Sequence, residues 1–208
     1  MSAEVHRKPP SRARRSQAER TADTRGRILR AVVESIAEVG FQRTTASEIA
    51  DRAGVTWGAV QHHFGGKDGI LRAALEDSFA RFAERLSDVP AAGAPLEERV
   101  AAFVDRAWEH FASPHYRSTF EILLSQAGRD GGSGESSWQA GMFRAWERIW
   151  RRLFGDASLP RRRSAELQRF TIAVLSGAAW LKLLGGPDAK DGAELELLKQ
   201  TLVRELGT

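Results

Sequence analysis

The stretch Thr45–Lys67 constrains the fold more than any other part of the chain, because it has the pattern of two short helices joined by a tight turn. Thr45 can cap the first helix, and Glu48 three residues later completes a Ser/Thr-x-x-Glu capping box. Gly54 stands where the end of that helix favours a residue that tolerates left-handed dihedral angles. Thr56 can cap the second helix. Together these features predict a helix-turn-helix, a motif that places its second helix in the major groove of DNA.

The residues around this motif resemble one protein family. The run IADRAGVTWGAVQHHFGGKDGIL is similar to the signature of the tetracycline-repressor (TetR) family of bacterial transcription regulators. The preceding run ILRAVVESIAEVGFQRTT matches the first helix of the family and its Gly-x-x-x-Thr-Thr loop. The resemblance covers about residues 25–75; beyond them only the helix pattern and the total length agree. The family usually has Tyr where this chain has Gln61, whose amide can hydrogen-bond to DNA and can read adenine with two hydrogen bonds.

Few side chains of so short a second helix can reach the base edges of DNA. We expect Thr56, Trp57 and Gln61 to do so, with the backbone at Gly58 close to a base or a phosphate. A helix favours Ala over Gly by about 1 kcal/mol, and either close approach to DNA or helix packing would explain Gly58. Trp57 either contacts a thymine methyl or sugar, or covers a neighbouring helix. The resemblance implies phosphate contacts at Thr44, Thr45, His62, His63 and Lys67.

Positive charge is concentrated beside this motif. Residues 1–30 hold nine Lys and Arg against three Asp and Glu, whereas the whole chain has a net charge of only +4. The excess therefore lies where a phosphate backbone would be. We interpret residues 1–21 as a disordered basic arm, either a solvated leader or an arm that reaches into a minor groove.

The rest of the chain has the apolar spacing of long helices, which predicts an all-α fold of about nine helices. A three-helix DNA-binding bundle (residues 22–68) precedes a larger helical domain for ligand binding and dimerisation (residues 69–208). The expected helix at 164–184 is apolar on nearly all sides and must be buried on more than one of them. Either intrachain core or a second copy of the chain would cover it. We expect a homodimer through the last two helices, 164–184 and 193–206.

Aromatic side chains are frequent in the larger domain, and most of them suit its core. The resemblance also implies a pocket for a small, often apolar ligand, whose binding shifts the spacing of the two DNA-reading heads. His110 and Gln126 are polar candidates for this pocket. Its other expected lining residues are Trp108, Phe111, Tyr116, Phe120, Glu121, Trp146 and Trp180.

The sequence argues against several other functions. It shows no nucleophile–base arrangement and no metal-ligand spacing, and the loop at 128–137 lacks the Gly-Lys-Ser/Thr ending of a phosphate loop, so we expect neither an enzyme nor a cofactor. The absence of cysteine, of a secretory signal and of a long apolar run predicts a cytoplasmic protein. The hypothesis is a dimeric transcriptional regulator, a repressor that a small molecule releases from a pseudo-palindromic operator. The alternative is a constitutive DNA-binding dimer with no effector.

Overall fold

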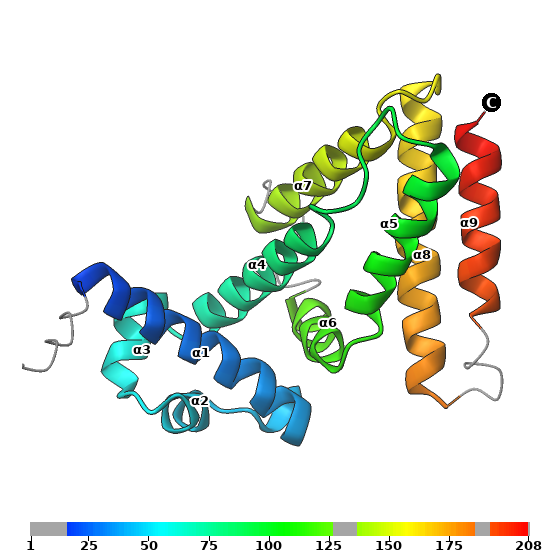
Figure 1. Ribbon diagram of the computed structural model, residues 1–208. Coiled ribbons are helices and arrows are strands. Elements are labelled where there is room, and N and C mark those ends of the chain that lie inside the picture. The colour runs from blue at the N-terminus through cyan, green and yellow to red at the C-terminus, as the bar shows by residue number, and fades with distance from the viewer. Residues whose placement is uncertain (1–15, 127–136, 186–191, 208) are drawn as a thin grey trace, which may run out of the picture.

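The computed structural model describes residues 16–126, 137–185 and 192–207, and this part of the chain is all-α. A bundle of α1 to α3 lies at one end of the molecule, α4 leads from it into the larger domain, and α8 and α9 run side by side at the opposite end (Figure 1). The helices are α1 (Gln17–Val39), the 3-10 helix η1 (Phe41–Arg43), α2 (Ala46–Ala53), α3 (Trp57–Phe64), α4 (Lys67–Arg85), α5 (Leu96–Phe111), α6 (Pro114–Gln126), α7 (Ser137–Phe154), α8 (Arg161–Leu183) and α9 (Ala193–Leu206).

The first helix begins earlier than the apolar pattern predicts. Ser16 caps α1 by accepting a hydrogen bond from the backbone N–H of Glu19, and the Glu19 carboxylate accepts one from the N–H of Ser16 at 2.7 Å. This capping box starts the helix at Gln17, so the prediction of a disordered arm up to residue 21 was wrong for its last residues. Residues 1–15 of the expected arm lie outside the described residues.

The helix-turn-helix forms largely as its local signals predict. The hydroxyl oxygens of Thr45 and Thr56 each accept a backbone hydrogen bond at 3.2 Å, and Gly54 adopts the left-handed conformation with φ of 63°. One detail differs: the Glu48 carboxylate accepts a hydrogen bond from the buried Ser35 hydroxyl of α1 at 2.6 Å. The expected capping residue thus ties α2 to α1.

Gly69 lets α4 begin directly after α3. A Cβ atom at this position would lie 1.7 Å from the carbonyl oxygen of Phe64, the last residue of α3. No side chain fits there without moving the backbone of one of the two helices. The close approach fixes α3 against the start of the next helix.

The core of the bundle extends beyond the boundary expected at residue 68. The fully buried Ile70 and Leu71 of α4 belong to it, as does Ile122 of α6. The second half of α4 contributes Phe82 and Leu86 to the core of the larger domain instead. We therefore place the end of the bundle within α4, near residue 75.

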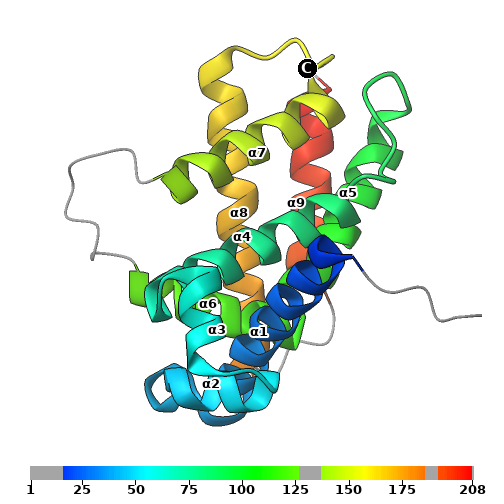
Figure 2. The ribbon, with the colours of Figure 1, turned by 90° about the vertical axis from the view of Figure 1, so that its left-hand side faces the viewer.

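In the larger domain α7 packs against α4 and, seen from the bundle side, crosses in front of α8 (Figure 2), while α5 packs against both α4 and α8. Its core includes Phe103 of α5, Leu153 of α7 and Leu175 of α8, all fully buried. The buried Arg99 donates to the Leu153 carbonyl oxygen and pairs with Asp156 at 2.7 Å. No helix in the described part of the chain has the length and apolar character needed to span a membrane.

Candidate DNA-binding surface and ligand pocket

One side of α3 is buried and the other is open to solvent. Val60 is fully buried in the bundle core, whereas the Trp57 side chain is 43% exposed at the first position of the helix. Gln61 and His62 are also exposed, and the Gln61 amide donates a hydrogen bond to the Gly65 carbonyl oxygen at 3.2 Å. The residues expected to read bases therefore share an accessible surface.

At Gly58 of the same helix, no neighbouring described residue would prevent a larger side chain from fitting. A Cβ atom there would meet only the Thr56 hydroxyl oxygen, at 3.8 Å. Helix packing therefore does not account for this glycine, and close approach of its backbone to DNA stays a prediction.

The residues expected to contact phosphates divide into two groups. Thr45 and His62 are exposed, and His63 is partly buried beside Phe64, their ring centroids 6.3 Å apart. Thr44 is only 2% exposed, and its hydroxyl donates to the Gly40 carbonyl oxygen at 3.0 Å. The structure contradicts a phosphate contact by the Thr44 side chain, because burial and this internal hydrogen bond occupy the hydroxyl.

Lys67 has a structural contact that the sequence did not reveal. Its ammonium group donates to the Thr44 carbonyl oxygen at 2.7 Å and lies 5.3 Å from the centre of the Phe41 ring. It therefore holds the loop between α1 and α2 against the start of α4. Contact between Lys67 and a phosphate stays a prediction.

Two arginines of α1 also stabilise the bundle. The Arg27 guanidinium donates to the Ala53 carbonyl oxygen at the end of α2, at 3.2 Å. Arg25 lies over the Phe64 ring, 4.7 Å from its centre. Part of the positive charge near the motif therefore serves packing between helices.

A cavity of about 450 Å³ lies in the larger domain, enclosed by residues of α4, α5, α6, α7 and α8. Its wall is mostly apolar and aromatic. Four expected residues, Phe111, Tyr116, Phe120 and Trp146, line it together with His110. The others in the wall are Leu75, Glu76, Ser78, Phe79, Phe82, Thr119, Leu123, Gly141, Met142, Phe143, Ile172 and Ser176.

The remaining expected lining residues lie elsewhere, and these predictions were wrong. Trp108 borders a separate, much smaller hollow, where the Lys182 ammonium lies 5.7 Å from its ring centre. Trp180 packs edge-on against Phe120, their ring centroids 5.0 Å apart. Glu121 points to η1, as described below, and Gln126 is absent from the cavity wall.

The α4 part of the wall was missed from the sequence, because none of the expected lining residues lies on this helix. The spacing of Phe79 and Phe82 was the available signal, since the two aromatic residues lie one turn apart and both reach the cavity. Their ring centroids are 5.8 Å apart.

Two titratable groups inside the wall, His110 and Tyr116, are neutral at pH 7. Burial, together with smaller contributions from the nearby His115 and Arg85, lowers the pKa of His110 to about 4. Burial raises the pKa of Tyr116, an effect that its hydrogen bond with Ser176 partly offsets. The two hydroxyl oxygens are 3.3 Å apart.

Helix α6 connects the cavity with the bundle. Tyr116, Phe120 and Leu123 face the cavity. On the other side of the helix, the Glu121 carboxylate accepts a hydrogen bond from the backbone N–H of Phe41 at 3.0 Å, and the fully buried Ile122 packs in the bundle core. A single helix therefore carries residues of both regions.

Comparison with known proteins agrees with this geometry. Residues 28–74 match the family model described as "Bacterial regulatory proteins, tetR family". This bundle is a TetR-family domain. The match covers α2, α3, the second half of α1 and the first part of α4, which is close to the extent of the buried bundle core along these helices.

The sequence relatives are named as transcriptional regulators. HTH-type transcriptional regulator BetI 1 of Chromohalobacter salexigens is 45% identical over 51 residues, which are 24% of this chain and 25% of that protein. HTH-type transcriptional regulator CymR of Pseudomonas putida is 29% identical over 117 residues, 56% of this chain and 57% of that protein. The chain thus matches a quarter to somewhat over half of the length of these two relatives.

The fold similarity extends over most of the chain. A TetR family transcription regulator from Marinobacter aquaeolei VT8 superposes with a TM-score of 0.68 at 17% identity, over 91% of this chain and 98% of the other. The larger domain therefore shares its architecture with a TetR-family protein. The two curated relatives named above are both transcriptional regulators.

Proposed function

We propose that the protein is a dimeric, sequence-specific DNA-binding transcriptional regulator, a cytoplasmic repressor that a small molecule releases from a pseudo-palindromic operator. The observation that carries the proposal is the TetR-family bundle with Trp57 and Gln61 exposed on α3. An α-helix of this kind fits the major groove, where an indole can contact a thymine methyl and an amide can read adenine.

The surface of α8 supports the dimer. One side of this helix carries the buried Leu167, Leu175 and Ala179, which pack on its own domain. The other side exposes large apolar residues with small ones between them, and a Cβ atom at Gly177 would meet nothing within 4 Å. This exposed series is Phe170, Ala173, Gly177, Leu181 and Leu184.

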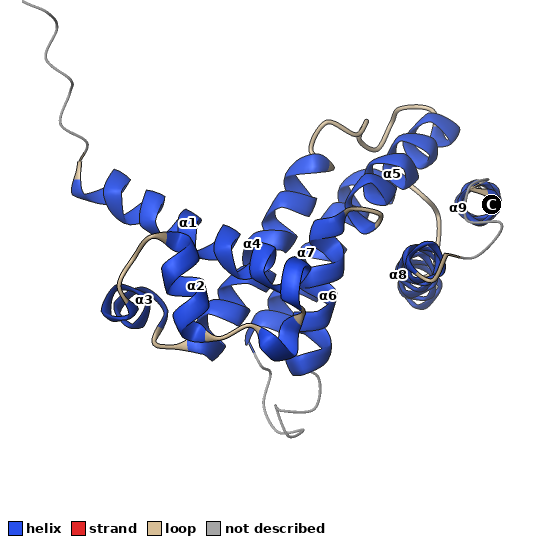
Figure 3. Ribbon diagram, turned by 90° about the horizontal axis from the view of Figure 1, so that it is seen from below, coloured by secondary structure: helices blue, strands red, loops and turns tan. Residues whose placement is uncertain are grey.

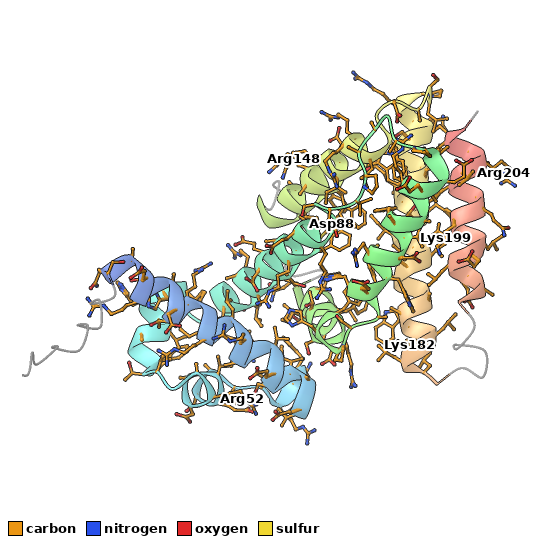
Figure 4. All side chains as sticks on the ribbon, in the orientation of Figure 1. Arg52, Asp88, Arg148, Lys182, Lys199 and Arg204 are labelled. Atoms are coloured by element: carbon orange, nitrogen blue, oxygen red, sulfur yellow. The ribbon has the colours of Figure 1, made fainter. Side chains whose placement is uncertain are left out.

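The same surface lies at the edge of the molecule farthest from α3. Figure 3 shows α8 and α9 nearly end-on, side by side at that edge. Lys199, on the side of α9 that faces α5 (Figure 4), holds α9 on its own domain through Asp105 of α5 at 2.8 Å. Leu197 of α9 is exposed. A second copy packed here across a two-fold axis would bury the apolar series and leave both α3 helices free for DNA.

The cavity and α6 support a ligand response. A cavity of about 450 Å³ is large enough for a small organic molecule. A ligand that binds better to one arrangement of α6 would shift the bundle through Glu121 and Ile122, and DNA affinity would change by the difference in ligand affinity between the two states. This cavity favours the regulated protein over the constitutive dimer.

The test is selection of binding sites from random duplex DNA by the purified protein at two salt concentrations. We expect an enriched inverted repeat with one fixed half-site spacing. Trp57→Ala and Gln61→Ala should lose the enrichment, and Leu124→Ala, at an exposed apolar residue of α6, should retain it. Salt-sensitive binding without any enriched motif would contradict sequence-specific regulation and favour an architectural DNA-binding protein.

A ligand response requires a second measurement. A molecule that binds the larger domain tightly should lower the affinity for the selected operator. If tight binding leaves this affinity unchanged, the protein is a constitutive DNA binder.

A further inference from the structure

The cavity wall is a continuous aromatic surface. The Phe82 ring centroid lies 4.9 Å from that of Trp146 and 5.9 Å from that of Phe111. The Phe111 centroid lies 4.6 Å from that of Tyr116. Phe143 of α7 extends this surface to solvent, since it lines the cavity and is 58% exposed. The faces of such rings carry partial negative charge and attract cations.

The formal charge in the cavity wall is also negative, like the partial charge on the ring faces. Among the described lining residues, Glu76 of α4 is the one with a side chain charged at pH 7, and none is Lys or Arg. Glu76 is exposed, so its carboxylate lies at the solvent edge of the cavity. Within the described part of the chain, this carboxylate forms no ion pair.

The described residues that line the interior offer no positive charge to an anion. Burial keeps His110 neutral at pH 7, with a pKa of about 4. The hydroxyl groups are already paired: Tyr116 with Ser176 at 3.3 Å, and Thr119 with Ser78 at 3.1 Å. A carboxylate or phosphate would lose its hydration here without gaining a cationic partner.

We propose that the ligand of this cavity is an organic cation with an apolar body, held by the rings of Phe82, Phe143 and Trp146 and drawn to the Glu76 carboxylate. This names the ligand class within the proposed function and rests on it. Each element of the site has its own role: the rings hold the body and face the charge, and Glu76 favours entry of a cation over that of an anion.

The test compares three small probes of similar shape by calorimetry on the full-length protein. They are benzyltrimethylammonium, its neutral isostere neopentylbenzene and the anion phenylmethanesulfonate. We expect the cation to bind about fivefold or more tightly than the neutral probe, and the anion to bind most weakly.

Two variants separate the contributions of charge and ring. Glu76→Gln should weaken binding of the cation about two- to fivefold and leave the neutral probe unchanged. Glu84→Gln is the matched control, because this exposed carboxylate of the same helix is absent from the cavity wall, and it should change neither affinity. Phe143→Leu keeps an apolar side chain at an exposed site, so the fold should persist while the cation loses more affinity than the neutral probe.

Three results would overturn the proposal: equal or tighter binding of the neutral or anionic probe, no binding of any probe, or unchanged cation affinity in both Glu76→Gln and Phe143→Leu. Failure of the proposed function gives a different pattern. If the cation binds with the expected preference but operator affinity does not change, the ligand class is supported and the ligand response is refuted. The DNA selection involves none of these probes.

Discussion

Replacing Glu121 by Ala tests whether α6 couples the cavity to the DNA-binding bundle. The Glu121 carboxylate accepts the backbone N–H of Phe41 at 3.0 Å, across 80 residues of sequence. Phe41 is the first residue of η1, and its ring lies beneath the Lys67 ammonium, which in turn holds the Thr44 carbonyl oxygen. The substitution therefore removes one contact from α6 and frees a backbone donor on which this loop depends.

The size of the effect follows from the type of hydrogen bond. Hydrogen bonds to a charged group contribute about 1.5–3 kcal/mol to the free energy of unfolding. The Glu121 side chain is 26% exposed, which favours the lower end of this range because water can replace part of the lost interaction. We expect Glu121→Ala to lower the free energy of unfolding of the protein by about 1.5 kcal/mol and its Tm by about 3–6 °C.

Hydrogen exchange measured by mass spectrometry gives a direct readout. If the contact opens locally, amide exchange in a peptide covering residues 40–45 should accelerate by about tenfold, since 1.4 kcal/mol is a factor of ten. Glu121→Gln keeps a carbonyl oxygen as acceptor and should restore part of the protection. The same loosening should reduce the effect of a bound ligand on operator affinity, because α6 then holds η1 less firmly.

Arg117→Ala supplies the matched control. Arg117 pairs with the same carboxylate at 3.6 Å on the surface of α6, so its removal should cost about 0.5 kcal/mol or less. If Glu121→Ala changes exchange at residues 40–45 no more than Arg117→Ala does, the contact with Phe41 is not a coupling element and the reasoning is refuted.

Three further predictions concern the recognition helix, the dimer and pH. Gly58→Ala should raise stability by about 1 kcal/mol, because Ala favours a helix and the site is open, and it should weaken operator binding; unchanged binding would show that the backbone does not approach DNA. Leu181→Glu should convert the dimer to monomer in analytical ultracentrifugation and leave the helical content of the chain intact; a dimer that persists would place the interface elsewhere. The pKa of His110 is about 4 in the folded protein, against an ordinary value of 6.5, so the unfolded chain binds a proton more readily than the folded one. The contribution of neutral His110 to the free energy of unfolding is therefore fully present above pH 6.5, and the free energy of unfolding falls by up to roughly 3 kcal/mol as the pH decreases toward 4. Denaturant titrations of His110→Gln should show a shallower decline over this range, and an equal slope would refute the assignment.

The helix-turn-helix was predictable because its signals are local. Thr45, Gly54 and Thr56 act within one turn of their own helix, and each adopts the predicted cap. The start of α1 was encoded just as locally, by Ser16 and Glu19. It was missed because the residues that follow lack an apolar stripe, so hydrophobic periodicity gave no sign of a helix whose first turns extend into solvent.

The cavity wall could be predicted only in part, because it depends on which side of each helix faces which neighbour. Tyr116 and Phe120, four residues apart on α6, face the cavity, whereas Glu121, one residue further on, turns to η1. Periodicity groups residues onto one face of a helix, but it does not say which element covers that face. The same reasoning explains why Lys67, at a position where the family resemblance implies a phosphate contact, also bonds to the backbone of Thr44.

Two leucines show how directly the cavity and the bundle are connected. Leu75 is buried in the bundle core and also lines the cavity. Leu123 packs against the same core and forms another part of the wall. Because close-packed side chains have few alternative positions, a ligand that presses on either leucine must move it into the bundle core or move its helix. The two helices concerned, α4 and α6, are also those that hold Lys67 and Glu121 against the loop between α1 and α2. Ligand size at this end of the cavity should therefore affect DNA binding more than ligand size at the Phe143 end, where the wall opens to solvent.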